Sequence, residues 1–222
     1  VSIGAHTDKK LGIPGEDAEG VISAVEMLRN IGDDIYPDFT GLNVVVVGGG
    51  NVAMDVARSA IRLGAKTVKV AYRRRRVDMT ALPEEVEGAI ADGCDIVELH
   101  SPVRIEKDDK GHCKSIVLKP QIIGGVRYGR PSPKDSQAPE VEMKADLVLV
   151  AIGQGIDFRK FEEYQGITIE SGRINALDTS ALQNAEGIFA GGDCVTGPAT
   201  VIRAIAAGKT AAANIDEYLG FF

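Results

Sequence analysis

The sequence predicts an α/β fold built around a parallel sheet. Two aliphatic runs, at residues 42–47 and 147–152, have the continuous valine- and leucine-rich character of strands that are buried on both faces. A helix-forming segment follows the first run directly, and another strand-like run lies at residues 67–72. Because a single helix connects the strands at 42–47 and 67–72, we expect these strands to be parallel and joined by a right-handed crossover.

The helix after the first strand is predicted over residues 51–63. Val52, Val56 and Ala60 recur at helical spacing and mark the face that should be buried. Gly64 follows the last periodic residue and is well placed to end the helix.

A further helix is predicted to start at Pro83, because proline suits the first helical position. Glu84 and Glu85 occupy its first turn, where the helix dipole favours negative charge. The two glutamates are also candidates for a catalytic acid or base, but the helix start explains them more simply, and we name no catalytic residue. The buried face of this helix is expected at Leu82, Val86, Ala89 and Ile90.

Antiparallel hairpins accompany these elements. The turn-forming sequence at 108–111 lies between two strand-like runs and predicts a hairpin that adds an antiparallel layer to the parallel sheet and its helices. The remaining predicted elements are, in chain order, a strand end and loop (1–17), a short helix (21–30), a loop rich in Gly, Pro and Ser (124–139), a second hairpin (166–175), a short strand (187–190) and a closing helix (198–218).

Composition and charge exclude several classes of protein. The chain has 222 residues, of which 44% are apolar and 26% charged, as expected for a globular protein and not for a disordered segment. Its formal net charge of −7 argues against a protein that coats nucleic acid or an anionic membrane. The aliphatic runs are too short to cross a bilayer. We therefore expect neither nucleic acid nor a membrane among its partners.

The cysteine and histidine patterns argue against disulfide and metal chemistry. Cys94, Cys113 and Cys194 are odd in number and form no CxxC pair. The three histidines stand apart, without the spacing of metal ligands, so no metal site is predicted. A reducing, cytoplasmic setting is the expected location.

The sequence Gly48-x-Gly50-x-x-Ala53 is a candidate dinucleotide-binding motif at a strand-to-helix turn. The first glycine permits a tight turn, the second permits close approach to a pyrophosphate, and the alanine lets the helix pack closely on the strand. The helix N-terminus then offers N–H groups to phosphate oxygens. The alternative is a tight turn without a ligand. The candidate site residues in this loop are Gly48, Gly49, Gly50, Asn51, Val52 and Ala53.

Four consecutive arginines, residues 73–76, follow the strand at 67–72. At this position NAD sites usually place a carboxylate for the ribose 2′-OH, whereas guanidinium groups suit the 2′-phosphate of NADPH. Two charge-assisted contacts of about 1.5 kcal/mol each would favour NADPH by roughly 100-fold. Arg73 and Arg74 are the candidate contacts, and the alternative is a solvated run of charge.

Together these residues resemble a known family. The segment VVVVGGGNVAMDVARSAIRLGAKTVKVAYRRRR, residues 44–76, is similar to the NADPH-binding unit of flavin oxidoreductases with two dinucleotide-binding domains. The glutamate synthase small subunit and its relatives, which include dihydropyrimidine dehydrogenase, are the closest resemblance. Three more segments agree in the family's order: residues 2–17 resemble the crossover out of the FAD domain, residues 151–154 the return crossover, and residues 187–199 the second FAD motif.

The resemblance implies a Rossmann-like NADPH-binding domain with remnants of an FAD-binding domain. It assigns residues 1–22 to a trailing strand and crossover of the FAD domain, residues 23–156 to the NADP(H) domain and residues 157–222 to the C-terminal FAD segment. It adds two cofactor-binding candidates, Gly153 on the return crossover and Asp193, which would hydrogen-bond the FAD ribityl chain. The N-terminus of the closing helix would point at the flavin and stabilise its reduced form.

The resemblance also implies a role in electron transfer. In the parent protein hydride would pass between NADPH and FAD, and electrons would be exchanged with iron–sulfur clusters or a partner subunit. The family's first FAD fingerprint and its iron–sulfur region have no counterpart in the sequence, which begins at Val1. We therefore expect a fragment that binds NADPH, does not retain FAD and is inactive alone. Its uncovered FAD-domain surfaces would suit a homodimer.

Three alternatives stay open at this point. The chain could be an NADPH-binding module without activity, which the missing FAD fingerprint favours. It could be a relative of disulfide or peroxide reductases, which the absence of a CxxC pair disfavours. It could be an interaction domain on a Rossmann scaffold, which the glycine loop and the arginine run disfavour.

Overall fold

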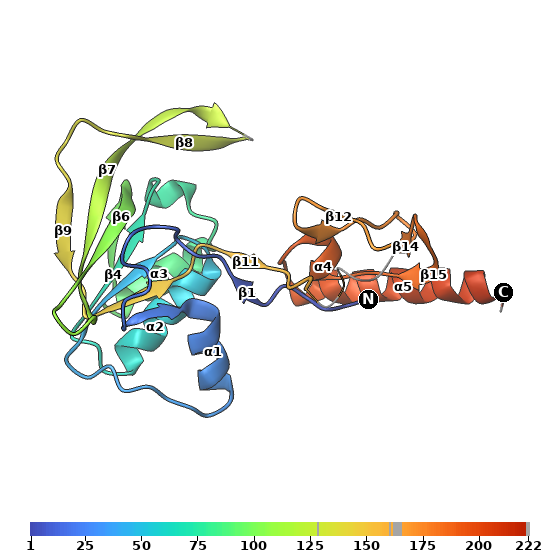
Figure 1. The fold of residues 1–222 in the computed structure, drawn as a ribbon, viewed down its shortest axis with the longest axis horizontal. Coiled ribbons are helices and arrows are strands. Elements are labelled where there is room, and N and C mark those ends of the chain that lie inside the picture. Colours follow the sequence, from blue (N-terminus) through green and yellow to red (C-terminus); the bar gives the residue numbers. More distant parts are fainter. Residues whose placement is uncertain (128, 160, 162–165, 221–222) are drawn as a thin grey trace. The chain divides into compact units, whose positions relative to one another are not determined.

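A computed structural model describes residues 1–127, 129–159, 161 and 166–220 of the chain (Figure 1). The chain divides into two compact units, one formed by residues 8–153 and the other by residues 1–7 together with 154–222. The short strands β1 (Thr7–Asp8) and β11 (Gln154–Gly155) pair where the chain passes from one unit to the other.

The unit 8–153 contains the predicted parallel sheet. Its strands in the described chain are β2 (Val21–Ser23), β3 (Asn43–Val47), β4 (Thr67–Tyr72), β5 (Asp95–Glu98) and β10 (Leu147–Val150), in the order β2-β10-β3-β4-β5. Each neighbouring pair is parallel. The predicted α/β class and the parallel pairing of β3 with β4 are therefore confirmed.

Helices cover one face of this sheet. They are α1 (Ala24–Gly32), α2 (Asn51–Arg62) and α3 (Pro83–Ala91). Alternate valines of β3 point to opposite faces, so Val44 and Val46 pack among the helices while Val45 and Val47 belong to a second core. This explains why β3 is a continuous aliphatic run, since both of its faces are buried.

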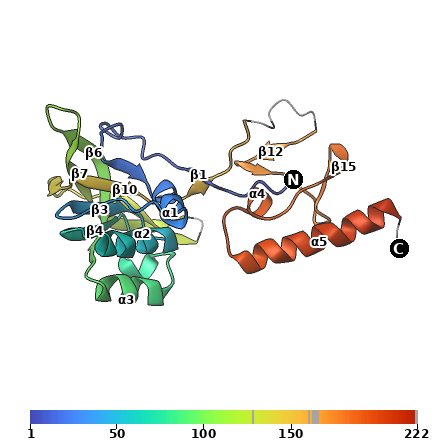
Figure 2. The ribbon, with the colours of Figure 1, turned by 90° about the horizontal axis from the view of Figure 1, so that it is seen from below.

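An antiparallel sheet covers the other face. It contains β6 (His100–Lys107), β7 (Cys113–Arg127) and β9 (Val141–Lys144), and Ile105, Ile116 and Leu118 pack on the second core. Figure 2 shows α2 and α3 on one side of β3 and β4, and β6 and β7 on the other. The three-layer architecture expected from the sequence is present in this unit.

Two local predictions differ from the structure. The loop predicted at 124–139 is instead the end of β7 paired with β8 (Arg130–Asp135), which tolerates Pro131 and Pro133 because an edge strand does not need every N–H in a ladder. The helix predicted at 21–30 begins only after β2, at Ala24, where the Ser23 side chain accepts a hydrogen bond from the Glu26 N–H.

The predicted buried face of α3 was half right. Val86 and Ala89 are buried, but Leu82 is 56% exposed and Ile90 is 39% exposed. Leu82 is the N-cap residue and has an extended backbone, so helical periodicity does not apply to it. Pro83 starts the helix, as predicted.

The described part of the second unit contains short strands and two helices. The elements are β12 (Ile169–Glu170), β13 (Arg173–Ile174), β14 (Ala181–Leu182), β15 (Ala185–Phe189), α4 (Asp193–Thr196) and α5 (Val201–Leu219). Ile174, Leu182, Ala190 and Cys194 form its small core. The antiparallel pair β12–β13 matches the hairpin predicted at 166–175.

The closing helix differs from its prediction in where it starts. It begins at Val201 and not at 198, because Thr200 retains an extended backbone and serves as the N-cap. No residue of α5 within the described chain is buried. Among the described residues no helix combines the length and apolar character needed to span a membrane, and no group of His, Cys, Asp or Glu side chains is arranged to hold a metal ion.

Candidate nucleotide-binding site

Three loops leave the same edge of the parallel sheet. Val47 at the end of β3 is in register with Ala71 of β4 and with Val150 of β10. The glycine loop, the arginine run and the segment containing Gly153 therefore all start at the carboxyl ends of neighbouring strands. This is the edge where open α/β sheets bind their ligands.

Gly48 and Gly49 lie where neither residue could carry a side chain. A Cβ atom on Gly48, whose φ is +150°, would lie 2.3 Å from the carbonyl oxygen of Ala151. A Cβ atom on Gly49 would lie 2.5 Å from the ring of Tyr72. Both glycines are thus required by packing between neighbouring strand ends, and they leave the backbone itself as the surface available to a ligand.

Gly50 opens the N-terminus of α2. It is the N-cap residue, and no side chain in the described part of the chain caps the helix. The side-chain oxygen of Asn51 accepts a hydrogen bond of 2.8 Å from the Leu82 N–H and so turns away from the first helical amides. Val52 is half-buried, and Ala53 is fully buried against the sheet. This N-terminus fits a pyrophosphate, which needs free N–H donors and close backbone approach.

The segment before α3 holds this turn in place, a contact that was not predicted from the sequence. The N–H groups of Thr80 and Ala81 donate to the Gly49 carbonyl oxygen at 2.9 and 3.1 Å. Together with the bond between Asn51 and Leu82, they fasten the segment before α3 onto the glycine loop. Nothing in the local pattern of residues 79–82 indicates this role, because the partners come from a different strand connection.

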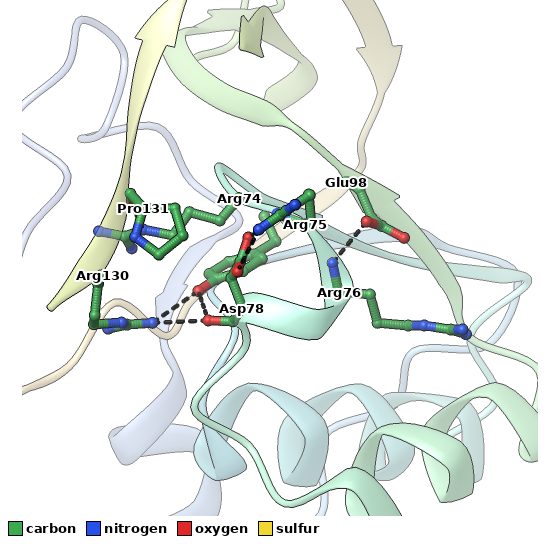
Figure 3. Close-up of polar contacts among 8 residues, drawn as sticks. Arg74, Arg75, Arg76, Asp78, Glu98, Arg130 and Pro131 are labelled. Atoms are coloured by element: carbon green, nitrogen blue, oxygen red, sulfur yellow. Dashed lines mark hydrogen bonds and ion pairs between the residues drawn. The ribbon is translucent and has the colours of Figure 1, made fainter. Parts of the chain in front are cut away.

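The structure separates the four arginines by their partners. Arg75 forms an ion pair with Asp78, with distances of 2.8 and 3.0 Å to its two carboxylate oxygens. The backbone N–H of Arg76 donates to a Glu98 carboxylate oxygen at 2.6 Å, and Arg76 opens the short helix η1 (Arg76–Asp78). Figure 3 shows both contacts. The charge of Arg75 is therefore already neutralised.

Arg73 and Arg74 have different surroundings. Arg74 donates from Nε to the carbonyl oxygen of Pro131 at 2.6 Å, a neutral acceptor. Arg73 is exposed when the whole residue is considered. Partial desolvation of its guanidinium group, together with the positive charges of Arg74 and Arg130, lowers its pKa. In the described chain neither guanidinium has a carboxylate within ion-pair distance. Both groups are available to an anion.

The remaining site candidates lie apart from these loops in sequence. Gly153 is exposed beyond β10, with φ of +122°, and its carbonyl oxygen accepts a hydrogen bond from the Lys9 N–H. Asp193 belongs to the second unit, where it is the half-buried first residue of α4 and follows Gly192.

Glu85 has a structural partner. It pairs with Arg58 at 3.0 Å, and Arg58 also pairs with Asp92 at 2.9 Å, so this group of charges ties α2 to α3. Glu84 is exposed in the first turn of α3. These contacts agree with the helix-start interpretation of the two glutamates.

The three cysteines are all buried and free. Burial is the main cause that raises the pKa of Cys94 to about 11 and the pKa of Cys113 to about 11. A thiol reacts as its thiolate, so both groups are poorly suited to dithiol exchange.

Comparison with known proteins agrees with the fold and with the family resemblance. The sequence profile of the family described as "Pyridine nucleotide-disulphide oxidoreductase" matches residues 1–208. The NADP(+)-dependent formate dehydrogenase subunit beta of Moorella thermoacetica is 37% identical over 222 residues, which are 99% of this chain and 31% of that protein. The glutamate synthase [NADPH] small chain of Halomonas elongata is 33% identical over 99% of this chain and 49% of its own length.

Solved structures show the same fold at lower identity. FprA from Mycobacterium tuberculosis in complex with NADPH has a TM-score of 0.75 at 22% identity, over 98% of this chain and 62% of that chain. Thioredoxin reductase from T. acidophilum has a TM-score of 0.75 at 18% identity, over 97% and 64%. The chain spans roughly a third to a half of the first-mentioned relatives.

Proposed function

The chain belongs to the pyridine nucleotide-disulphide oxidoreductase family, and on that premise we propose that its unit 8–153 binds NADPH. One observation carries the proposal: two features that suit NADPH lie at the same edge of the sheet. The N-terminus of α2 follows the glycine loop and has no side-chain cap in the described chain, and Arg73 and Arg74 at the end of β4 have no ion-pair partner there. The resemblance to the glutamate synthase small chain, expected from the sequence, is confirmed by the relatives.

Each part of the nucleotide has a proposed contact. The pyrophosphate lies on the backbone from Gly48 to Ala53, where N–H groups of the first turn of α2 donate to its oxygens. Arg73 and Arg74 hold the 2′-phosphate through charge-assisted hydrogen bonds. Gly153, at the end of the neighbouring strand, leaves room for the rest of the nucleotide because it carries no side chain.

We propose that the parent protein is an NADPH-dependent flavoprotein oxidoreductase. The cofactors supply the hydride chemistry when bound, and this chain supplies binding and orientation. Asp193 is the proposed contact to FAD, and its place after Gly192, whose Cα is open to approach, supports it. Electrons would then pass to iron–sulfur clusters or a partner subunit, and the subunit names of two relatives support the partner subunit.

Two properties of the chain by itself are also proposed. It binds NADPH without turnover and, when purified, carries no yellow flavin. The exposure of α5 supports a homodimer in which a second copy of the chain packs against this helix. Sedimentation that finds only monomer would exclude the homodimer.

Paired calorimetric titrations with NADPH and NADH test the central proposal. We expect NADPH to bind at least about tenfold more tightly, and the double variant Arg73→Ala/Arg74→Ala to lose that difference while still binding NADH. Equal affinity in the unmodified chain would mean that the arginines are only a solvated face. Binding of neither nucleotide would contradict the nucleotide site as a whole.

A further inference from the structure

The β7–β8 hairpin brings a fifth arginine to the arginine run. Arg130, the first residue of β8, donates from Nη2 to the hydroxyl of Tyr72 at 3.1 Å and to the carbonyl oxygen of Asp78 at 2.9 Å. Its neighbour Pro131 accepts the hydrogen bond from Arg74. Figure 3 shows Arg130 and Pro131, both from β8, beside Arg74 and Asp78 of the segment that follows β4. Two consecutive residues of β8 thus contact the segment that follows β4.

The acceptors that hold Arg130 and Arg74 are neutral. A hydroxyl and two backbone carbonyls fix the directions of these guanidinium groups without forming an ion pair with them. The nearby carboxylate of Asp78 is used by Arg75 through both of its oxygens. Within the described residues Arg130 therefore has no carboxylate at ion-pair distance, and its charge is close enough to Arg73 to disfavour the protonated form there.

Three like charges gathered at one strand end repel one another unless an anion joins them. The hydrogen bonds to neutral acceptors keep this group preorganised, so an arriving phosphate does not have to order long side chains. A phosphate dianion, with three acceptor oxygens, can accept from more than two guanidinium groups.

We propose that Arg130 is a third cation of the site for the 2′-phosphate, together with Arg73 and Arg74, and that it makes the β7–β8 hairpin part of the nucleotide specificity. This inference rests on the proposed NADPH site. Arg130 lies 58 residues after Tyr72 and belongs to a different layer of the unit. It would add to the phosphate site a cation that the segment after β4 does not itself supply.

Two small ligands isolate the 2′-phosphate. Adenosine 2′,5′-bisphosphate and adenosine 5′-monophosphate differ only in that group, and both can be titrated into the chain at one fixed ionic strength by calorimetry. We expect Arg130→Gln to weaken binding of the bisphosphate about tenfold and to leave the monophosphate nearly unchanged, since glutamine keeps one donor for the Asp78 carbonyl. Lys134→Gln is the matched control, because it removes one positive charge from an exposed position on the same strand.

The possible results distinguish a failure of the proposed NADPH site from a failure of the role assigned to Arg130. If the unmodified chain does not prefer the bisphosphate, the proposed NADPH site itself is wrong. If it does, and Arg130→Gln keeps the full preference, only the role of Arg130 is wrong. Equal weakening of both ligands would also overturn the inference, because it would show that Arg130 acts on the fold around Tyr72 and not on the 2′-phosphate.

A second measurement needs no variant and therefore does not depend on the folding of Arg130→Gln. Phenylglyoxal labels arginine, and mass spectrometry identifies the labelled residue. We expect the bisphosphate, at concentrations that saturate the chain, to protect Arg130 from labelling, while the monophosphate does not. Identical labelling of Arg130 with the two ligands would overturn the proposal.

Discussion

Gly48 lies so close to Ala151 that no side chain fits between them. A Cβ atom on Gly48 would stand 2.3 Å from the carbonyl oxygen of Ala151, and the backbone there has φ of +150°. The glycine at the start of the motif is therefore fixed by the meeting of β3 with β10. The dinucleotide-binding motif and the packing of the central strands use the same residue.

We expect Gly48→Ala to destabilise the chain by about 2 kcal/mol or more, because the contact is with backbone and cannot be relieved by a rotamer change. Chemical denaturation of the variant measures this cost. Gly50→Ala is the matched control: its φ is −104° and a Cβ there would meet only Thr80 Oγ1, at 3.4 Å.

Gly50→Ala should fold normally but bind NADPH more weakly, since the added methyl group would narrow the proposed pyrophosphate site at the start of α2. Calorimetric titration measures that loss. If Gly50→Ala binds as tightly as the unmodified chain, the pyrophosphate does not lie on this turn.

Arg75 should not contribute to nucleotide choice. Both oxygens of Asp78 hold its guanidinium, so we expect Arg75→Gln to preserve the ratio of NADPH to NADH affinity within about threefold. Titration of the two nucleotides tests this, with Arg73→Gln as the comparison that should lower the ratio. Loss of preference in Arg75→Gln alone would show that the ion pair opens to receive the phosphate.

The charge group between α2 and α3 predicts an acid-dependent stability. The hydrogen bond and charge of Arg58 lower the pKa of Asp92 from its ordinary value of 3.8. A carboxyl with a lowered folded-state pKa contributes stability above 3.8, and this contribution is lost as pH falls through the lower folded value. We therefore expect Asp92→Asn to have a lower melting temperature than the unmodified chain at pH 7, with the difference shrinking below about pH 4.

Melting curves recorded across that pH range test the sign. Asp95→Asn, which removes an exposed carboxyl outside this charge group, should show no comparable trend. If the melting-temperature difference between Asp92→Asn and the unmodified chain grows on acidification, Asp92 does not stabilise the fold through its ionised form.

The buried cysteines should resist alkylation in the folded chain. With a pKa of about 11 in place of 9.0, the thiolate populations of Cys94 and Cys113 fall about 100-fold, and burial blocks access as well. Iodoacetamide at mildly alkaline pH should label them only after denaturant is added. Rapid labelling of either thiol in the native chain would reopen the disulfide-reductase alternative.

The parts of the fold that could be predicted are those that depend on residues close together in the sequence. The strands β3, β4 and β10 follow from aliphatic runs, α2 from its helical periodicity, and the start of α3 from Pro83, because burial and propensity act on neighbours in sequence. The division of the chain into the segments 1–22, 23–156 and 157–222, and their assignment to cofactors, stays a prediction.

Tertiary structure decided what each arginine can do. The sequence by itself determined a candidate dinucleotide motif and a run of four arginines at the end of β4. It could not separate Arg75, neutralised by Asp78, from Arg74, held by the Pro131 carbonyl. Nor could it bring in Arg130, since the β7–β8 arm reads locally as a Gly- and Pro-rich loop. Pairing of strands far apart in the chain places these groups together, and such pairing leaves no local signal in the residues that it joins.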